Sequence, residues 1–291
     1  MSGGSSAESD FDDSPIVVGG LGGSGTRVLA EVVSGLGVHI GDCLNHANDN
    51  RWFALLFRRE SWSVAAPHGD VRTSLDLFAR ASLDGLQGRT NAEERALIGA
   101  AWSDWLLART QPAEARQVRD ALLGSAGLVR ADHLGWGWKE PNSHVFIPEI
   151  ARRFPRARFV LLVRNGLDMA FSRNQLQLRQ WGPRFGLSGK PTPETALDYW
   201  IRANQRARDG LDRHLPGHWL ELRFEAMVRD PRKAVGDVAD LIGAEAKYSE
   251  LDRLAAYVQS PTTVGRFRDR DLSVFRDDQL ETLRKLGFET A

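Results

Sequence analysis

The chain of 291 residues contains only one cysteine, Cys43. A single thiol forms neither an internal disulfide nor a cysteine-ligated zinc site, so no metal site is predicted and a reducing cytoplasm is the expected location. Runs of 18 apolar residues are also missing, so no transmembrane helix is predicted. The opening MSGGSSAESDFDDSP lacks the basic and apolar segments of a signal peptide. We interpret residues 1–14 as a disordered tail.

A net charge of either sign is missing as well. The sequence has 38 basic and 38 acidic residues. Because proteins that bind nucleic acids generally carry a basic excess, no nucleic-acid partner is predicted. Local basic sites for one small anion stay allowed. The 42% hydrophobic content is ample for a core, and we expect residues 15–291 to form a single domain.

A glycine-rich loop, GGLGGSG, lies between two apolar segments near the start of the chain. The segment before it is typical of a buried strand, and the segment after it has helical spacing up to Gly37. Backbone N–H groups in such a loop, followed by a helix N-terminus, favour phosphate binding. The loop ends in Gly-Thr-Arg and lacks the Lys of a nucleoside-triphosphate loop. The dinucleotide pattern Gly-x-Gly-x-x-Gly fits, but no acidic residue follows at the required distance.

The rest of the chain alternates between apolar strands and amphipathic helices. Residues 50–123 read as helices, and the segments WGWK, RFVLLV and HWLELRFE read as strands. This order predicts an α/β fold: a P-loop-type central parallel sheet flanked by helices, with a helical insert over about 50–123. Because ligands of such sheets bind at the carboxyl ends of the strands, the glycine loop and the strand ends at Lys139 and Arg164 are predicted to meet at one edge.

A second anion anchor is predicted after the strand RFVLLV. Arg164 follows this strand directly, and Ser172 lies eight positions later, after a segment that opens a helix. Both side chains can face one phosphate. The alternative interpretation is that Arg164 is a salt-bridged strand end and Ser172 an ordinary helix position.

Several motifs together resemble the sulfotransferase superfamily. GGSGTR resembles its 5′-phosphosulfate loop, and VRNGLDMAFS resembles its 3′-phosphate motif, with the same separation of Arg and Ser. Three further stretches are similar to family segments in the same order: WKEPNSHVFIPEIARRFPRARFVLLVRNG, LELRFEAMVRDPRKAVGDVADLIG and TVGRFRD. The resemblance covers about residues 15–271, with the helical insert unmatched.

The resemblance implies the donor 3′-phosphoadenosine 5′-phosphosulfate (PAPS), bound without Mg²⁺. It also implies sulfuryl transfer to a hydroxyl of a small-molecule or saccharide acceptor, such as a carbohydrate, a natural product or an aryl alcohol. The donor-binding residues that it implies are Gly22, Gly23, Ser24, Gly25, Thr26, Arg27, Arg164, Ser172, Thr263, Gly265 and Arg266.

The catalytic cation is left open between two residues. Gly23 stands where the family loop carries a basic residue, and Arg27 occupies a usual Thr position. Either Arg27 reaches back to the leaving phosphate, or Lys139 carries the positive charge. An acceptor hydroxyl also needs a general base. The candidates are Glu140, Asp49 and His46, with His133 and His144 as further alternatives.

Two other functions compete with sulfuryl transfer. One is a P-loop phosphotransferase that uses ATP, and the absent Lys counts against it. The other is a catalytically silent relative that binds the nucleotide as a scaffold, and the glycine at position 23 favours it. The sequence does not identify the acceptor or the oligomeric state.

Overall fold

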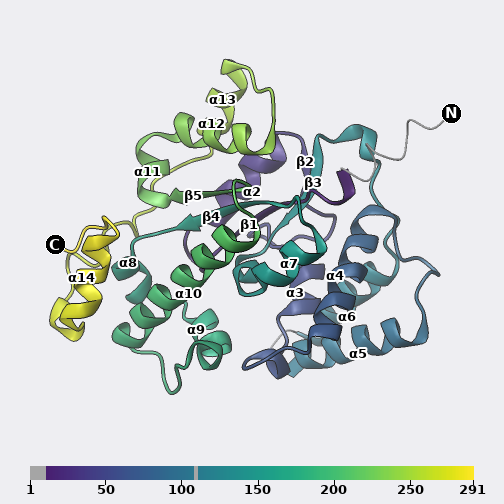
Figure 1. The fold of residues 1–291 in the computed structure, drawn as a ribbon, viewed down its shortest axis with the longest axis horizontal. Coiled ribbons are helices and arrows are strands. Elements are labelled where there is room, and N and C mark those ends of the chain that lie inside the picture. Colours follow the sequence, from purple (N-terminus) through teal and green to yellow (C-terminus); the bar gives the residue numbers. More distant parts are fainter. Residues whose placement is uncertain (1–10, 108–110) are drawn as a thin grey trace.

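A computed structural model describes residues 11–107 and 111–291 (Figure 1). Its centre is a five-stranded parallel sheet with the order β2-β3-β1-β4-β5. The strands are β1 (Ile16–Gly20), β2 (Val38–His39), β3 (Gly135–Lys139), β4 (Arg158–Val163) and β5 (Trp219–Arg223). Helices cover both faces of the sheet (Figure 1). The predicted fold class is confirmed.

The helices fall into three groups along the chain. After β1 comes α2 (Thr26–Gly35). The insert between β2 and β3 contains α3 (Arg51–Phe57), α4 (His68–Leu83), α5 (Ala92–Leu107) and α6 (Pro112–Leu123). The rest are α7 (Ile147–Arg153), α8 (Gly166–Ala170), α9 (Leu176–Trp181), α10 (Pro193–His214), α11 (Phe224–Arg229), α12 (Pro231–Ile242), α13 (Tyr248–Ala255) and α14 (Asp277–Lys285).

The sheet is buried because its strands are apolar on both faces, as a parallel sheet requires. In β1, Ile16 and Val18 belong to a cluster with α2 and α12, whereas Val17 belongs to the larger cluster with α3, α7 and α10. The alternation of side chains along one strand thus divides the core into two layers. Together they hold the carboxyl edge of β1 in a fixed position between β3 and β4.

The helical insert packs directly on the sheet through aromatic side chains. Phe53 of α3 stacks on Phe57 at 4.2 Å between ring centroids and on Trp138 of β3 at 5.4 Å. Phe78 of α4 meets Trp138 edge-on at 5.1 Å. The insert therefore shares the main hydrophobic core, and α3 is fixed close to the end of β3.

The segment GLDMAFSRNQLQLRQ, residues 166–180, reads as one helix in the sequence but forms two helices in the structure. The carboxyl end of α8 is capped by the side chain of Gln175, whose Nε2 donates to the carbonyls of Met169 and Ser172 at 3.0 and 2.9 Å. The chain turns there and starts again as α9. This break directs the α8–α9 connection toward the end of the sheet that carries the glycine loop, since Gln177 reaches the loop.

The expected disordered tail is wrong for residues 11–14, and residues 1–10 lie outside the described residues. Phe11 packs against the main core, and its carbonyl accepts a 3.0 Å hydrogen bond from the Trp136 indole. Asp12 forms an ion pair with Arg130 at 3.0 Å. The apolar Phe11 and the partner of Asp12, 118 residues away, explain why a polar composition alone misassigned this segment.

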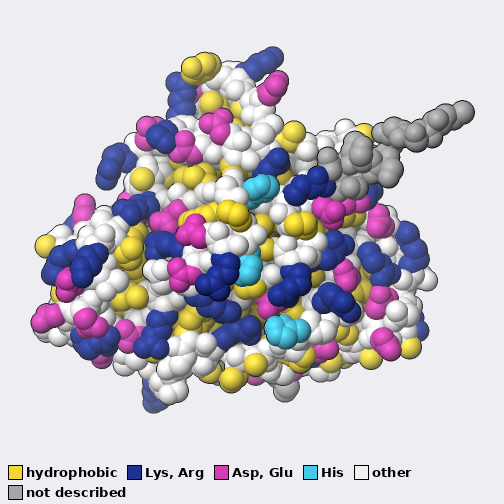
Figure 2. Space-filling model, in the orientation of Figure 1, with side chains coloured by type: hydrophobic (Ala, Val, Ile, Leu, Met, Phe, Trp, Pro, Cys, Tyr) yellow, Lys and Arg dark blue, Asp and Glu magenta, His cyan; other side chains and the backbone are white. Residues whose placement is uncertain are grey.

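The surface carries mixed charge. On the face that Figure 2 shows, basic and acidic side chains are interspersed. Within the described ranges, none of the helices has the length and apolar character needed to cross a bilayer.

Candidate functional site

The glycine loop after β1 follows a path that only glycine allows. Gly20, Gly23 and Gly25 have positive φ values of 143°, 98° and 102°. A Cβ atom on Gly20 would lie 2.4 Å from the carbonyl oxygen of Leu162, and one on Gly25 would lie 2.4 Å from the Phe224 ring. The backbone is thus pressed against β4 and α11, where only a residue without a Cβ atom fits.

The start of α2 fits an anionic ligand. Gly25 is the N-cap and makes no side-chain capping bond, so the first N–H groups of a ten-residue helix keep their positive potential. Ser24 is buried, and its Oγ has no partner among the described residues. Thr26 is buried beside it, whereas Arg27 is exposed. A phosphate or sulfuryl oxygen at this point would satisfy the free hydroxyl and the free amides.

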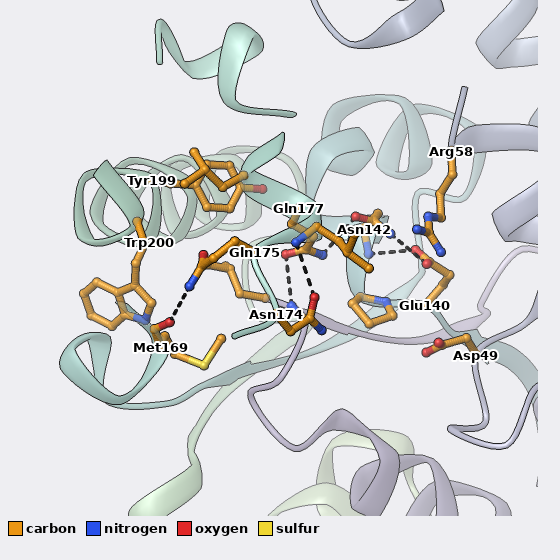
Figure 3. A pocket seen from close by; sticks show the side chains of 16 residues that line it. Asp49, Arg58, Glu140, Asn142, Met169, Asn174, Gln175, Gln177, Tyr199 and Trp200 are labelled. Carbon is orange, nitrogen blue, oxygen red and sulfur yellow. Dashed lines mark hydrogen bonds between the residues drawn. The ribbon is translucent and has the colours of Figure 1, made fainter. Parts of the chain in front are cut away.

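A chain of hydrogen bonds connects the loop to the end of β3 (Figure 3). The N–H of Gly22 donates to Gln177 Oε1 at 3.0 Å, and Gln177 Nε2 donates to Asn142 Oδ1 at 2.9 Å. Asn142 donates twice to the Glu140 carboxylate, from its backbone N at 2.7 Å and from Nδ2 at 2.8 Å. The Trp181 indole donates to the same Asn142 Oδ1 at 2.8 Å, which fixes the orientation of the amide.

A cavity of about 150 Å³ opens beside this chain of bonds. It lies between the glycine loop, α3, the end of β3, the α8–α9 connection and α10 (Figure 3). Its polar or charged lining side chains are Asp49, Arg58, Glu140, Asn142, Asn174, Gln175, Gln177 and Tyr199. The apolar side comes from Leu21, Met169, Leu176, Leu178, Ala196 and Trp200. The cavity therefore joins the loop to a mixed polar and apolar surface.

Two of the residues predicted as catalytic, Asp49 and Glu140, line this cavity, and a third, Lys139, pairs with Asp49. Glu140 is buried, and burial raises its pKa to about 7, with the nearby Asp49 charge adding to the rise. Lys139 is also buried: its Nζ donates to the Ala47 carbonyl at 2.9 Å and forms an ion pair with Asp49 Oδ1. Asp49 and Glu140 line the cavity, whereas Lys139 lies behind Asp49 and does not.

The histidine candidates lie elsewhere. His46 is exposed and does not line the cavity. His133 packs against the ring of His39 at 5.1 Å. His144 is buried, its Nδ1 lies 2.8 Å from the Pro141 carbonyl, and burial lowers its pKa to about 4, so the imidazole is neutral. The general base is therefore best sought among the two carboxylates.

Arg164 lies at the end of β4, in a buried ionic cluster. Its Nη2 pairs with Asp168 Oδ2 at 3.1 Å and donates to Thr263 Oγ1 at 3.2 Å, and Nη1 lies 3.5 Å from the carbonyl of Gly23. The same Asp168 carboxylate accepts a 2.9 Å bond from the N–H of Gly265. The glycine loop, β4 and the C-terminal loop thus meet at one guanidinium.

Arg266 adds a second positive charge to this cluster. Its Nε donates to the carbonyl of Thr263 at 3.2 Å, and burial and the nearby Arg164 lower its pKa. The hydroxyl of Ser172 accepts a 3.2 Å bond from the N–H of Asn174. That is a local turn contact, so Ser172 is not joined to Arg164 by any contact that the structure records.

Four residues at this site, Asp168, Asn142, Gln177 and Arg58, were not predicted from the sequence. Asp168 could have been found from the sequence, because it lies four positions after Arg164 near the start of a helix. Opposite charges at that spacing pair on a helix. Asn142 and Gln177 are neutral amides without a charge pattern. Arg58 ends the apolar run of α3 and reads there as a surface position.

The fold and site define an α/β protein with P-loop-like topology, whose glycine loop suits an anion. The sequence model of the sulfotransferase family matches residues 15–248, and the chain belongs to that family. No curated protein is detectably similar to it in sequence.

Solved structures agree in fold. The sulfotransferase domain from the curacin biosynthetic pathway is 13% identical, with a TM-score of 0.51 and coverage of 96% of this chain and 99% of that chain. The sulfotransferase domain of the Synechococcus PCC 7002 olefin synthase is 15% identical, with a TM-score of 0.50 and coverage of 96% and 95%. At these identities the likeness concerns the fold alone.

Proposed function

We propose that this chain is a PAPS-dependent sulfotransferase that moves a sulfuryl group to a hydroxyl of a small-molecule or saccharide acceptor. One observation carries the proposal: three neighbouring strands, β3, β1 and β4, end in Lys139-Glu140, the glycine loop and Arg164. This is the carboxyl edge where ligands of parallel sheets bind. Family membership supports sulfuryl transfer in general.

The donor's two anionic ends match two parts of the site. The loop residues from Gly22 to Thr26, with the free Ser24 hydroxyl, are proposed to hold the 5′-phosphosulfate. Arg164 and Arg266, with Thr263, are proposed to hold the 3′-phosphate. A guanidinium fork suits a terminal phosphate, and the loop amides suit a bridging one.

When bound, PAPS supplies the activated sulfuryl group, and the protein's own groups supply position and charge. Glu140 is the proposed general base. It lines the cavity and is connected to the glycine loop by three successive hydrogen bonds through Asn142 and Gln177. Its raised pKa of about 7 suits proton removal near neutral pH. Asp49, held by Lys139, keeps that pKa high.

The reaction is tested by transfer of ³⁵S from labelled PAPS to a library of hydroxyl acceptors. Labelled product is expected only when both the protein and a suitable acceptor are present. Binding that stays intact without any transfer would favour the catalytically silent relative instead.

Donor identity is tested separately by thermal shift. Adenosine 3′,5′-bisphosphate (PAP) should raise the Tm, and ATP with Mg²⁺ should not, because the loop lacks the phosphate-binding Lys. The reverse result would favour the phosphotransferase.

A further inference from the structure

The cavity beside the glycine loop is poor in positive charge. Two carboxylates line it, those of Asp49 and Glu140, whereas Arg58 is the only Lys or Arg among its lining residues. A group transfer that builds negative charge on a leaving phosphate needs a fixed positive charge nearby. One of the basic side chains near the loop must therefore supply that positive charge.

The other basic residues near the loop are committed or face elsewhere. Lys139 pairs with Asp49 behind the cavity wall. Arg164 is held by Asp168 in the cluster proposed for the 3′-phosphate. Arg27 is exposed on α2 and does not line the cavity.

Arg58, in contrast, has a free head group. It is half-buried, its Nε is fully buried without a hydrogen-bond partner, and its guanidinium forms no ion pair within 4 Å among the described residues. Figure 3 shows the guanidinium pointing toward Glu140, and its charge opposes the rise in the pKa of that carboxyl. A buried guanidinium N–H without a partner is costly unless a ligand or water accepts from it.

The backbone that carries Arg58 is fixed. Its N–H bonds to the carbonyl of Ala54 at 3.0 Å and closes α3. The next residue, Arg59, bonds to Asp104 at 3.0 Å and lies 4.6 Å from the centre of the Trp62 ring. An anchored backbone with a free head group is the arrangement expected of a preorganised charge.

We propose that Arg58, contributed by the helical insert, is a catalytic residue that contacts the transferring sulfuryl group. The inference rests on the proposed function. In the simplest reaction the acceptor is water: its oxygen bonds to sulfur, and the bond from sulfur to the bridging oxygen breaks. The electron pair stays on the leaving 5′-phosphate, and the water proton passes to Glu140. Arg58 N–H groups donate to the sulfuryl oxygens throughout.

The test compares binding of PAPS and of PAP, which differ only in the sulfuryl group. In calorimetry, Arg58→Gln should lower the affinity for PAPS at least tenfold. The affinity for PAP should stay within about twofold of wild type, because only PAPS presents the group that Arg58 contacts. Single-turnover release of sulfate to water should fall by about 10²–10³, as for loss of one transition-state contact. Arg58→Lys keeps the positive charge but lacks the planar guanidinium, so its PAPS affinity and its rate should lie between those of the wild type and those of Arg58→Gln.

The matched control is Arg173→Gln. Arg173 is exposed on the α8–α9 connection and lies outside the cavity lining, so both affinities and the rate should stay at wild-type values. If Arg58→Gln lowers the affinities for PAPS and PAP equally, or changes neither affinity, the proposed contact is wrong. A wild-type protein that binds neither nucleotide would instead overturn the proposed function. If Arg58→Gln does not fold, Arg58→Lys with wild-type PAPS affinity and rate overturns the contact.

Discussion

Lys139 and Asp49 form an ion pair that ties the end of β3 to the segment before α3. The second carboxylate oxygen of Asp49 accepts a 2.9 Å bond from Asn45. Asp49 lines the same cavity as Glu140. A buried lysine here balances a negative charge that would otherwise stand beside a second one.

Removing the lysine should therefore act through Asp49. Lys139→Met is expected to lower the free energy of unfolding by about 3 kcal/mol, because it leaves a half-buried carboxylate unpaired. It should also lower turnover at neutral pH, with PAP affinity nearly unchanged, because the unpaired Asp49 charge raises the pKa of Glu140 further and leaves less of the base ionised. Chemical denaturation, calorimetry and single-turnover kinetics measure the three quantities.

The double variant Lys139→Met, Asp49→Asn separates these effects. It removes both charges, so part of the lost stability should return. A double variant whose losses simply add would contradict the ion pair. If turnover is unaffected in Lys139→Met while Arg27→Ala binds PAP but does not turn over, Arg27 is the catalytic cation.

Arg164 should set the affinity for the 3′-phosphate. Arg164→Ala is expected to weaken PAP binding by about 2–4 kcal/mol, since a buried anion loses a charged partner. AMP, which lacks the 3′-phosphate, should lose far less. Calorimetry with both ligands checks this. Equal losses would rule out the assignment of Arg164 to the 3′-phosphate.

Gly25 tests the path of the glycine loop. Gly25→Ala places a Cβ 2.4 Å from the Phe224 ring at a φ of 102°, so a stability loss of about 1–3 kcal/mol and loss of PAP binding are expected. The matched control is Gly236→Ala in α12, where a Cβ meets nothing within 4 Å. That variant should gain about 0.5–1 kcal/mol. A tolerated Gly25→Ala would show that the loop does not need this backbone.

Glu140 should make both stability and rate depend on pH. Burial raises its pKa from the ordinary 4.5 to about 7, so the folded state binds the proton more tightly than the unfolded chain. The free energy of unfolding should then fall as pH rises from 4.5 to about 7, by at most about 1.4 kcal/mol per pH unit. Sulfuryl transfer should rise over the approach to pH 7 as the base ionises.

Glu140→Gln cannot ionise and should flatten the stability curve in that range, with Glu93→Gln, on an exposed helix position, as the control. Urea denaturation at a series of pH values gives the dependence of stability on pH, and single-turnover kinetics gives the dependence of the rate on pH. If the rate of Glu140→Gln depends on pH as in the wild type, Glu140 is not the general base, and Asp49 becomes the first candidate.

The sequence predicted the parts of the fold that carry strong local patterns. The strand before the glycine loop and the strand RFVLLV are continuous apolar runs, the helix after the loop has helical apolar spacing, and each is found. β2 was missed because it has two residues, too few for any period. The break between α8 and α9 was missed because it depends on Gln175 capping the earlier helix through three side-chain bonds.

The residues of the candidate site likewise divide into those that the sequence predicts and those that it does not. Glycines, Arg164 and Lys139 stand out because their types and places are unusual, whereas Arg58 is recognisable only when α3 is seen next to the glycine loop. Asn142 and Gln177 matter through the orientation of two amides, which no one-dimensional pattern records. Contacts of this kind join residues 35 and 155 positions apart, so they follow from packing.

The C-terminal loop has a consequence for protein synthesis. Asp168 accepts bonds from the N–H groups of Gly265 and Phe267, and Arg164 donates to Thr263. A nascent chain that ends before residue 263 already contains all five strands and the glycine loop, yet Thr263 and the two N–H groups that donate to Asp168 are still missing. If PAP binds as proposed, a ribosome-bound fragment that ends before residue 263 should gain less stability from PAP than the chain of 291 residues does.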